Sequence, residues 1–216
     1  MLTVKCFTFN PVQENTYIIY NENNLCCVID PGCYFDDERK ELLDFITRYK
    51  LTPKFLLNTH CHLDHVFGNA FIFDQFATVL HIHELEKQVL AFAPVSAHQW
   101  NLPFDNYNHE FILVREGDTI SLDDDSLRAL YTPGHSPGHI SFYCQEQQFV
   151  ICGDVLFNMS IGRTDLPGGD YNTLIESIRR KLFVLPDEVA VYPGHGEPTT
   201  IGFEKKHNPF LTERGV

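Results

Sequence analysis

The sequence contains no apolar run that approaches the roughly 20 residues of a membrane-spanning helix, so we expect no membrane partner. Its first ten residues, MLTVKCFTFN, lack the basic segment and the continuous apolar stretch of a signal peptide, and we therefore expect a cytoplasmic location. Basic side chains are also scarce, because 16 Lys and Arg stand against 29 Asp and Glu and the formal net charge is -13. A chain this acidic repels a phosphate backbone, which disfavours a nucleic-acid partner.

Cysteine pairs with the C-x-x-C spacing of metal or redox sites are missing from the sequence as well. None of the seven cysteines forms a C-x-x-C pair, and Cys6, Cys144 and Cys152 lie in apolar, strand-like runs. Buried, reduced thiols are therefore expected. The sequence also has no low-complexity linker and no block of like charge, so residues 1–216 are expected to form a single domain.

Hydrophobic patterning predicts strands and helices in both halves of the chain. Strands are expected over residues 2–9, 15–21, 25–32, 54–60 and 78–83, and again over 111–122, 126–135, 139–154 and 189–195. Helices are expected over residues 37–50, 65–76, from about 84, and over 171–185. Residues 91–109 have no clear pattern and are expected to form a loop or lid. These elements predict an α/β fold in which layered sheets are covered by helices.

The stretch NTHCHLDHVFGN, residues 58–69, places three histidines and an aspartate within six residues: His60, His62, Asp64 and His65. In an extended segment the first three share parity and would point to one face, whereas His65 has the opposite parity. A polar loop that only caps a helix does not need so many nitrogen and oxygen donors. The spacing therefore predicts a loop that faces two adjacent metal centres.

Three further ligand-type side chains each follow an apolar strand and a glycine, and they are His135, Asp154 and His195. Strand ends gather at one edge of a sheet in α/β folds, and glycine lets the backbone turn sharply there. We therefore expect these residues to lie close together. The remaining histidines are assigned no chemistry, although His139 is near enough to His135 to support a metal ligand.

The number of candidate ligands exceeds what one metal ion uses. A structural zinc ion is usually saturated by four ligands, often including cysteine, whereas the two groups above supply seven. Seven ligands suit two metal ions that share one carboxylate and keep open positions for water. In the alternative interpretation, one or two of the seven only orient the others through hydrogen bonds.

The ordered motifs resemble those of the metallo-β-lactamase superfamily. They are T-H-x-H-x-D-H at 59–65, T-P-G-H at 132–135, G-D at 153–154 and P-G-H at 193–195, and they span about residues 10–200. This resemblance implies an αββα sandwich of two mixed β-sheets flanked by helices. The stretches NPVQENTY, TPGHSPGH and GRTDLPGGD are similar to those of glyoxalase II-type hydrolases, also called hydroxyacylglutathione hydrolases. The chain resembles a short, single-domain branch without their additional C-terminal helical domain.

The resemblance also implies how the ligands are divided. One metal ion would bind His60, His62 and His135. The other would bind Asp64, His65 and His195, and Asp154 would bridge the two. Asp64 and Asp154 are thus the two carboxylates expected to act at the reacting centre. The cofactors would be two divalent ions, with zinc expected and iron or manganese as alternatives.

Hydrolysis of a thioester is chemically consistent with such a centre, although the centre alone does not require it. Metal binding lowers the pKa of water to about 7, and a metal ion can polarise a carbonyl. A thiolate leaves with little protonation, because a free thiol has a pKa of about 8.5. The expected reaction is attack by a metal-bridging hydroxide on S-lactoylglutathione or a related acyl thioester.

The resemblance places one substrate contact at Arg163, which matches a basic residue that contacts glutathione. In the alternative interpretation, Arg163 is a loop residue paired with Asp165 or Asp170. Two other functions remain open. One is a mononuclear iron persulfide dioxygenase, which shares the histidine motif and the GRTD loop, and the other is a non-catalytic, metal-stabilised interaction domain. The sequence does not indicate an oligomeric state.

Overall fold

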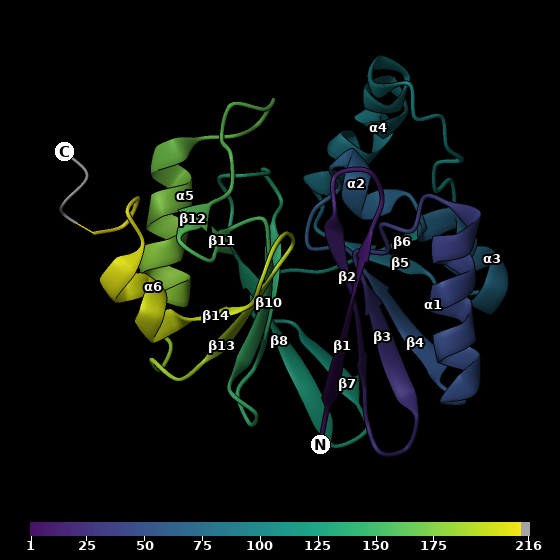
Figure 1. Ribbon diagram of the computed structural model, residues 1–216, viewed down its shortest axis with the longest axis horizontal. Helices are drawn as coiled ribbons and strands as arrows, with labels where there is room; N and C mark the ends of the chain where they lie inside the picture. The colour runs from purple at the N-terminus through teal and green to yellow at the C-terminus, as the bar shows by residue number, and fades with distance from the viewer. Residues whose placement is uncertain (213–216) are drawn as a thin grey trace. The chain divides into compact units, whose positions relative to one another are not determined.

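The computed structural model describes residues 1–212 (Figure 1). The chain divides into two compact units, one formed by residues 1–114 with 121–125 and the other by 115–120 with the chain from 126 onward. Two six-stranded sheets of mixed direction and their helices make up the fold, which confirms the expected α/β class. The single domain over residues 1–216 stays a prediction. Among the described residues, no helix combines the length and the apolar character that crossing a membrane requires.

The sheet of the first unit has its strands in chain order. They are β1 (Thr3–Phe9), β2 (Glu14–Tyr20), β3 (Leu25–Ile29), β4 (Thr52–Leu57), β5 (Leu80–Ile82) and β6 (Phe111–Leu113). The first three pair in antiparallel fashion, as their short connections require, and β3 to β6 pair in parallel through helical crossovers. The ligand-type residues of the first unit follow β3 and β4, at the carboxyl ends of these parallel strands.

Four helices form these crossovers: α1 (Asp36–Arg48), α2 (Leu63–Val66), α3 (Asn69–Phe76) and α4 (Glu86–Trp100). Helix α1 begins with three acidic residues and ends at Arg48, which complements the helix dipole at both ends. Its Leu42 and Ile46 join the apolar core of the first unit, together with Ile72 of α3 and alternate residues of the strands. Helices α1 and α3 therefore cover one face of this sheet (Figure 1).

The expected loop or lid over residues 91–109 is wrong for its first part, because α4 continues to Trp100. Pro94 lies inside this helix and cannot donate the hydrogen bond that the Leu90 carbonyl would normally accept. The side-chain nitrogen of Asn106 donates to that carbonyl instead, at 3.0 Å. A residue twelve positions further on thus replaces the missing donor, which local patterning could not indicate.

The second sheet has the strand order β14-β13-β10-β9-β8-β7. Its strands are β7 (Thr119–Leu122), β8 (Asp125–Tyr131), β9 (Ile140–Cys144), β10 (Phe149–Gly153), β13 (Ala190–Pro193) and β14 (Thr199–Thr200). Strands β8, β9 and β10 are antiparallel neighbours, and β10 pairs in parallel with β13. The carboxyl ends of β8, β10 and β13 consequently lie at the same edge of the sheet.

The remaining elements of the second unit pack on this sheet. They are the hairpin β11 (Leu156–Phe157) and β12 (Ser160–Ile161), helix α5 (Tyr171–Ser177) with the π-helical turn η1 (Ile178–Leu182), and α6 (Ile201–His207). Leu174, Ile178 and Ile201 pack with Val150 and Val191 of the sheet in one buried cluster. The helix expected over 171–185 is thus confirmed as far as Leu182.

Candidate metal centre

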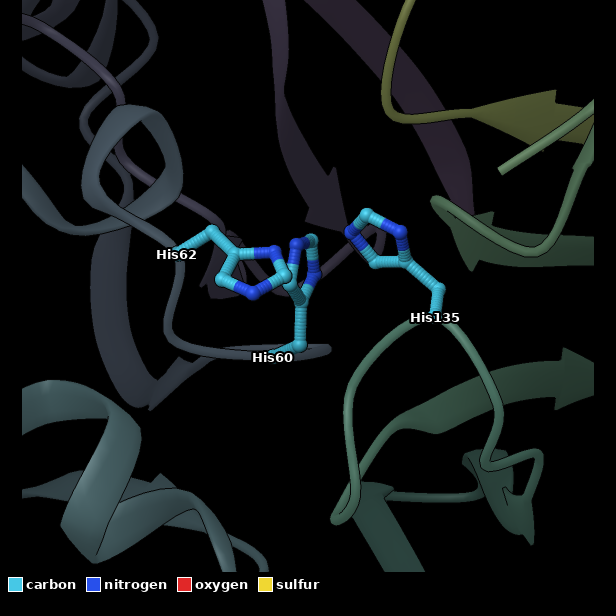
Figure 2. Close-up of side chains that lie close together, drawn as sticks. All are labelled: His60, His62 and His135. Carbon is cyan, nitrogen blue, oxygen red and sulfur yellow. The ribbon is translucent and has the colours of Figure 1, made fainter. Parts of the chain in front are cut away.

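Two ligand-type histidines of the first unit lie on the loop that follows β4. The ring centroids of His60 and His62 are 4.8 Å apart and their planes are nearly perpendicular. Figure 2 draws both side chains. His60 is fully buried, whereas His62 is partly exposed. His135, drawn in the same figure, belongs to the loop after β8 in the second unit.

The other two residues of the motif do not follow the extended geometry expected for them. Asp64 and His65 both lie in the single turn of helix α2, so the parity argument fails for Asp64. The turn brings Oδ2 of Asp64 to 3.6 Å from Nε2 of His65. His65 also lies beside His60, with ring centroids 4.1 Å apart. The four motif residues therefore do gather, but through a helical turn.

A buried carboxylate that sequence reasoning missed, Asp30, holds this loop in place. It follows the last residue of β3 and accepts four hydrogen bonds, from Asn58 Nδ2, Thr59 N, Thr59 Oγ1 and His65 Nδ1. Because a carboxylate can only accept, His65 carries its proton on Nδ1, and Thr59 must donate its hydroxyl hydrogen to Asp30. That hydroxyl can then only accept from Nδ1 of His60, 3.0 Å away. Both imidazoles therefore keep the Nε2 lone pair for a metal ion.

A second buried carboxylate supports the loop from helix α4. Glu86 is fully buried, and its Oε2 accepts the backbone N–H of Cys61 at 2.7 Å. The Cys61 side chain packs in the apolar core, and burial raises the pKa of its thiol well above the ordinary value. Cys61 is therefore a core residue and not a thiolate ligand.

The first unit also contains Glu14, whose side chain is completely buried. Burial raises the pKa of this carboxyl well above its ordinary value, and nearby His65 opposes the shift.

Asp30, His60 and His65 have ligand-type atoms within 4.8 Å of one another. Since both oxygens of Asp30 already accept hydrogen bonds from the loop, we interpret Asp30 as a support for the histidines.

In the second unit, sheet register brings the ligand-type residues together. Gly153 of β10 is the register partner of Pro193 of β13, and Gly194 N donates to Gly153 O at 2.8 Å. The residues that follow, Asp154 and His195, consequently meet, with Oδ2 and Nε2 3.6 Å apart. His135, which follows β8, approaches the same oxygen with its Nε2 at 3.5 Å. The strand-end prediction is confirmed for these three residues.

Main-chain contacts orient His135. Its Nδ1 lies 2.7 Å from the carbonyl oxygen of Arg163, and because a carbonyl only accepts, Nδ1 carries the proton and Nε2 keeps its lone pair. The GRTD loop passes close to the main chain of Asp154, and it can do so because residue 162 is a glycine. A Cβ at this position would lie 1.9 Å from the carbonyl oxygen of Asp154. No side chain fits there, so glycine is required.

His139 supports Asp154, a role that sequence reasoning considered only in general terms. Its Nε2 accepts the backbone N–H of Asp154 at 3.2 Å, so the proton is on Nδ1 and faces Oγ1 of Thr132 at 3.1 Å. That hydroxyl contacts Ser141 Oγ at 2.8 Å. A buried chain of hydrogen bonds thus fixes the peptide that carries Asp154.

The guanidinium of Arg163 forms two hydrogen bonds of 2.7 Å with the carboxylate of Asp165. This contact lowers the pKa of Asp165 to about 2, and both side chains are largely exposed. The structure therefore places Arg163 in the ion pair that the alternative interpretation described. Solvent-exposed pairs of this kind contribute little to stability, so the guanidinium can exchange Asp165 for another anion.

The stretch GHSPG, residues 134–138, formally matches the G-x-S-x-G pattern of serine hydrolases. That pattern needs an exposed serine on a strand-to-helix turn. Ser136 is completely buried and lies between two antiparallel strands, β8 and β9. It is therefore no nucleophile of this type.

The donor atoms of both units fit divalent metal ions. Two ligands that bind one ion at about 2.0–2.2 Å lie about 3.3–3.6 Å apart in tetrahedral geometry. The Nε2 to Oδ2 distances of 3.5 and 3.6 Å around Asp154, and of 3.6 Å between His65 and Asp64, are close to this spacing. Imidazole and carboxylate donors suit zinc, iron and manganese alike.

Comparison with known proteins agrees with this chemistry. The model of the metallo-β-lactamase superfamily matches residues 9–195. The hydroxyacylglutathione hydrolase GloC of Haemophilus influenzae is 37% identical over 215 residues, which cover 99% of this chain and 100% of GloC.

Two solved structures are similar over nearly the whole chain. The B3 metallo-β-lactamase BLEG-1 has a TM-score of 0.89 at 36% identity, and the match covers 97% of this chain and 100% of BLEG-1. TTHA1623, described in a di-iron-bound form, has a TM-score of 0.87 at 38% identity. The match covers 96% of this chain and 100% of TTHA1623. With a family match over most of its length, the chain belongs to the metallo-β-lactamase superfamily.

Proposed function

We propose that the chain is a dinuclear metal-dependent hydrolase that cleaves thioesters. In this proposal His60, His62 and His135 bind one divalent ion, Asp64, His65 and His195 bind the other, and Asp154 bridges the two. Zinc is the expected metal, with iron or manganese as alternatives. The assignment rests on the order of the motifs in the superfamily and on the ligand geometry within each unit.

One observation carries the two-metal arrangement. A single oxygen of Asp154 lies 3.5 Å from Nε2 of His135 and 3.6 Å from Nε2 of His195. Because the proposal assigns these two histidines to different ions, a carboxylate placed between them is suited to bridge those ions.

The metal ions, when bound, supply a lowered pKa for water and an electrophile for the substrate carbonyl. The chain supplies orientation. Asp30 and the Arg163 carbonyl keep protons on Nδ1 of His60, His65 and His135, so each imidazole presents Nε2. His139 holds the peptide of Asp154. A thiolate leaves without help from a protein acid, because the pKa of a free thiol is about 8.5.

The substrate class is proposed from two observations. GloC, at 37% identity, is a hydroxyacylglutathione hydrolase, which favours S-lactoylglutathione or a related acyl thioester. Arg163 lies in the loop after Asp154 and can offer its guanidinium to a substrate carboxylate if it releases Asp165. The cytoplasmic location stays a prediction.

The test measures metal content and turnover together. The purified chain is assayed with S-lactoylglutathione, with thioesters that lack glutathione, with a β-lactam, and with glutathione persulfide under oxygen monitoring. We expect about two ions per chain and thioester hydrolysis that a chelator abolishes. One iron per chain with oxygen uptake on the persulfide would establish the dioxygenase instead, and no turnover on any substrate would favour the interaction domain.

A further inference from the structure

Within the stretch NPVQENTY, residues 10–17, Asn10 and Glu14 are buried next to the metal-ligand loop but have no part in the proposed reaction. Asn10 adopts a left-handed backbone conformation with φ of 57°. Its side-chain Nδ2 donates to two carbonyls, those of Gly32 at 3.1 Å and Asp64 at 3.0 Å. Its backbone N–H donates to Glu38 of α1, and its Oδ1 accepts from Val12 N. Asn10 is thus fixed on all sides and holds the main chain of Asp64.

Glu14 lies beside the neighbouring candidate ligand, His65, on the Nδ1 side of its ring. Its Oε2 accepts the hydroxyl of Thr16 at 2.9 Å, and that hydroxyl accepts Gly32 N at 2.8 Å. Its Oε1 is buried without a hydrogen-bond partner and lies 3.8 Å from Nδ1 of His65. Leaving a carboxyl oxygen buried in this way is costly unless it has an electrostatic role.

The position of Glu14 indicates such a role. Nδ1 of His65 donates to Asp30, so the Glu14 oxygen faces the protonated side of the ring while Nε2 faces Asp64. An acidic group behind a metal-binding imidazole makes the ring a better ligand and fixes its orientation. Gly32 leaves room for this carboxyl, because a Cβ at position 32 would lie 2.0 Å from Oε2 of Glu14 and 2.7 Å from the Asp64 carbonyl.

The other half of the loop has a different support. The peptide between His60 and His62 is held by Glu86 through the N–H of Cys61. Among the described hydrogen bonds, none joins Asn10 or Glu14 to this peptide. The two pairs of motif ligands thus depend on separate buried glutamates.

We propose that Asn10 and Glu14 are positioning residues for the metal ion bound by Asp64 and His65, and that Glu86 positions the ligands of the other ion. The inference rests on the proposed two-metal function. It predicts that the affinity for each ion can be lowered without a change in the affinity for the other, although all four motif ligands lie within six residues.

The test uses three variants of the full chain. Glu14→Gln keeps the shape and replaces the acidic group by an amide, and Asn10→Asp removes the donor to Asp64 and tolerates the left-handed backbone. Glu86→Gln is the matched control. Metal-free proteins labelled with ¹⁵N-histidine are titrated with Zn²⁺ against a chromophoric chelator. Ring nitrogen resonances show which histidines bind each equivalent. Thermal unfolding of the metal-free proteins measures folding.

In the wild type we expect two equivalents, one of which shifts His65. Glu14→Gln and Asn10→Asp should lower the Zn²⁺ affinity of that equivalent about 10- to 100-fold and the affinity of the other less than about threefold. Glu86→Gln should show the reverse pattern. If both equivalents weaken equally, or neither changes, the inference is wrong even though the wild type binds two ions. If the wild type binds one ion without a shift of His65, the two-metal proposal and this inference both fail. If one variant does not fold, the other and Glu86→Gln still decide the pattern.

Discussion

The two compact units position their candidate metal-ligand side chains in different ways. In the first unit the candidate ligands follow one another within six residues, on a short loop and in the helical turn α2 that follows it. Buried side chains hold this segment: Asp30, Glu14, Glu86 and Asn10. In the second unit the ligands are far apart in sequence and follow three strands, and main-chain contacts place them. A segment outside a sheet needs side-chain supports because no main-chain hydrogen bonds to a neighbouring strand hold it. In a sheet, the register of the paired strands positions the strand ends.

This difference has a consequence for mutations. Each support is a single side chain whose removal leaves buried polar groups without their hydrogen-bond partners. In the second unit, the carbonyl that orients His135 and the register that joins Asp154 to His195 survive most side-chain replacements. We therefore expect the first unit to be sensitive at its supports and the second mainly at its ligands.

The largest effect is expected at the ligand shared in the second unit. Asp154→Asn should lower kcat/KM for a thioester about a thousandfold or more, since a bridging charge worth several kcal/mol in the transition state is lost. The fold should persist because β10 and β13 fix this position. Steady-state kinetics and thermal unfolding measure both, with Asp187→Asn, at an exposed pair with Lys205, as the control. Retention of more than a tenth of the activity would contradict the role of Asp154.

The next effect is expected at the main support of the first unit. Asp30→Asn keeps the shape and the tolerance for a left-handed backbone, but it places an amide donor against buried donors from Asn58, Thr59 and His65. Stability of the metal-free chain should fall by roughly 3 kcal/mol, as measured by urea unfolding.

Zinc affinity of Asp30→Asn should fall as well, because both imidazoles lose the partner that fixes their tautomer. Asp44→Asn, at an exposed pair with Lys40 in the same unit, should change neither quantity. An unchanged unfolding midpoint for Asp30→Asn would show that the loop does not depend on this carboxylate.

A smaller effect is expected at Thr132, where the second unit does use side chains. Thr132→Val removes the acceptor for Nδ1 of buried His139 without changing the shape much. We expect a loss of roughly 1–2 kcal/mol in urea unfolding and a modest fall in activity through the peptide of Asp154. Thr132→Ser should restore most of both. Equal losses in the valine and serine variants would mean that packing, not the hydrogen bond, matters here.

The smallest effect on folding is expected for Arg163→Ala. The carbonyl that orients His135 remains, and the lost pair with Asp165 is exposed, so stability should change by less than about 0.5 kcal/mol. Zinc affinity should also stay within threefold, while KM for an anionic thioester rises. A large loss of zinc affinity would show that the side chain, and not the main chain, places His135.

Much of the candidate site could be predicted because the rule used was local. Ligand-type residues after apolar strands and glycines are visible in the sequence, and the structure gathers His135, Asp154 and His195 as expected. Asp30 directly follows the apolar strand β3 in VIDPG but has no glycine before it, so it meets only the strand half of this rule and was missed. His139 had only its spacing from His135 as a signal.

The remaining features depend on contacts between distant residues. Nothing near Glu86 in the sequence indicates that it accepts from the Cys61 peptide, 25 residues earlier. Likewise, residues 91–109 have no clear pattern in the sequence. The hydrogen bond from Asn106 to the Leu90 carbonyl, which replaces the one that Pro94 cannot donate, joins residues 16 positions apart. Asp64 was placed on an extended segment, but the turn of α2 begins one residue before it. Such supports become visible only when the chain is folded.

The central claim is that two metal ions act together in thioester hydrolysis. The most direct measurement is a titration of the metal-free chain with Zn²⁺ in which bound metal and hydrolysis of S-lactoylglutathione are followed in the same samples. Activity should stay low at one equivalent and reach its maximum near two ions per chain. Full activity with one ion, or no hydrolysis with two ions bound, would contradict this account.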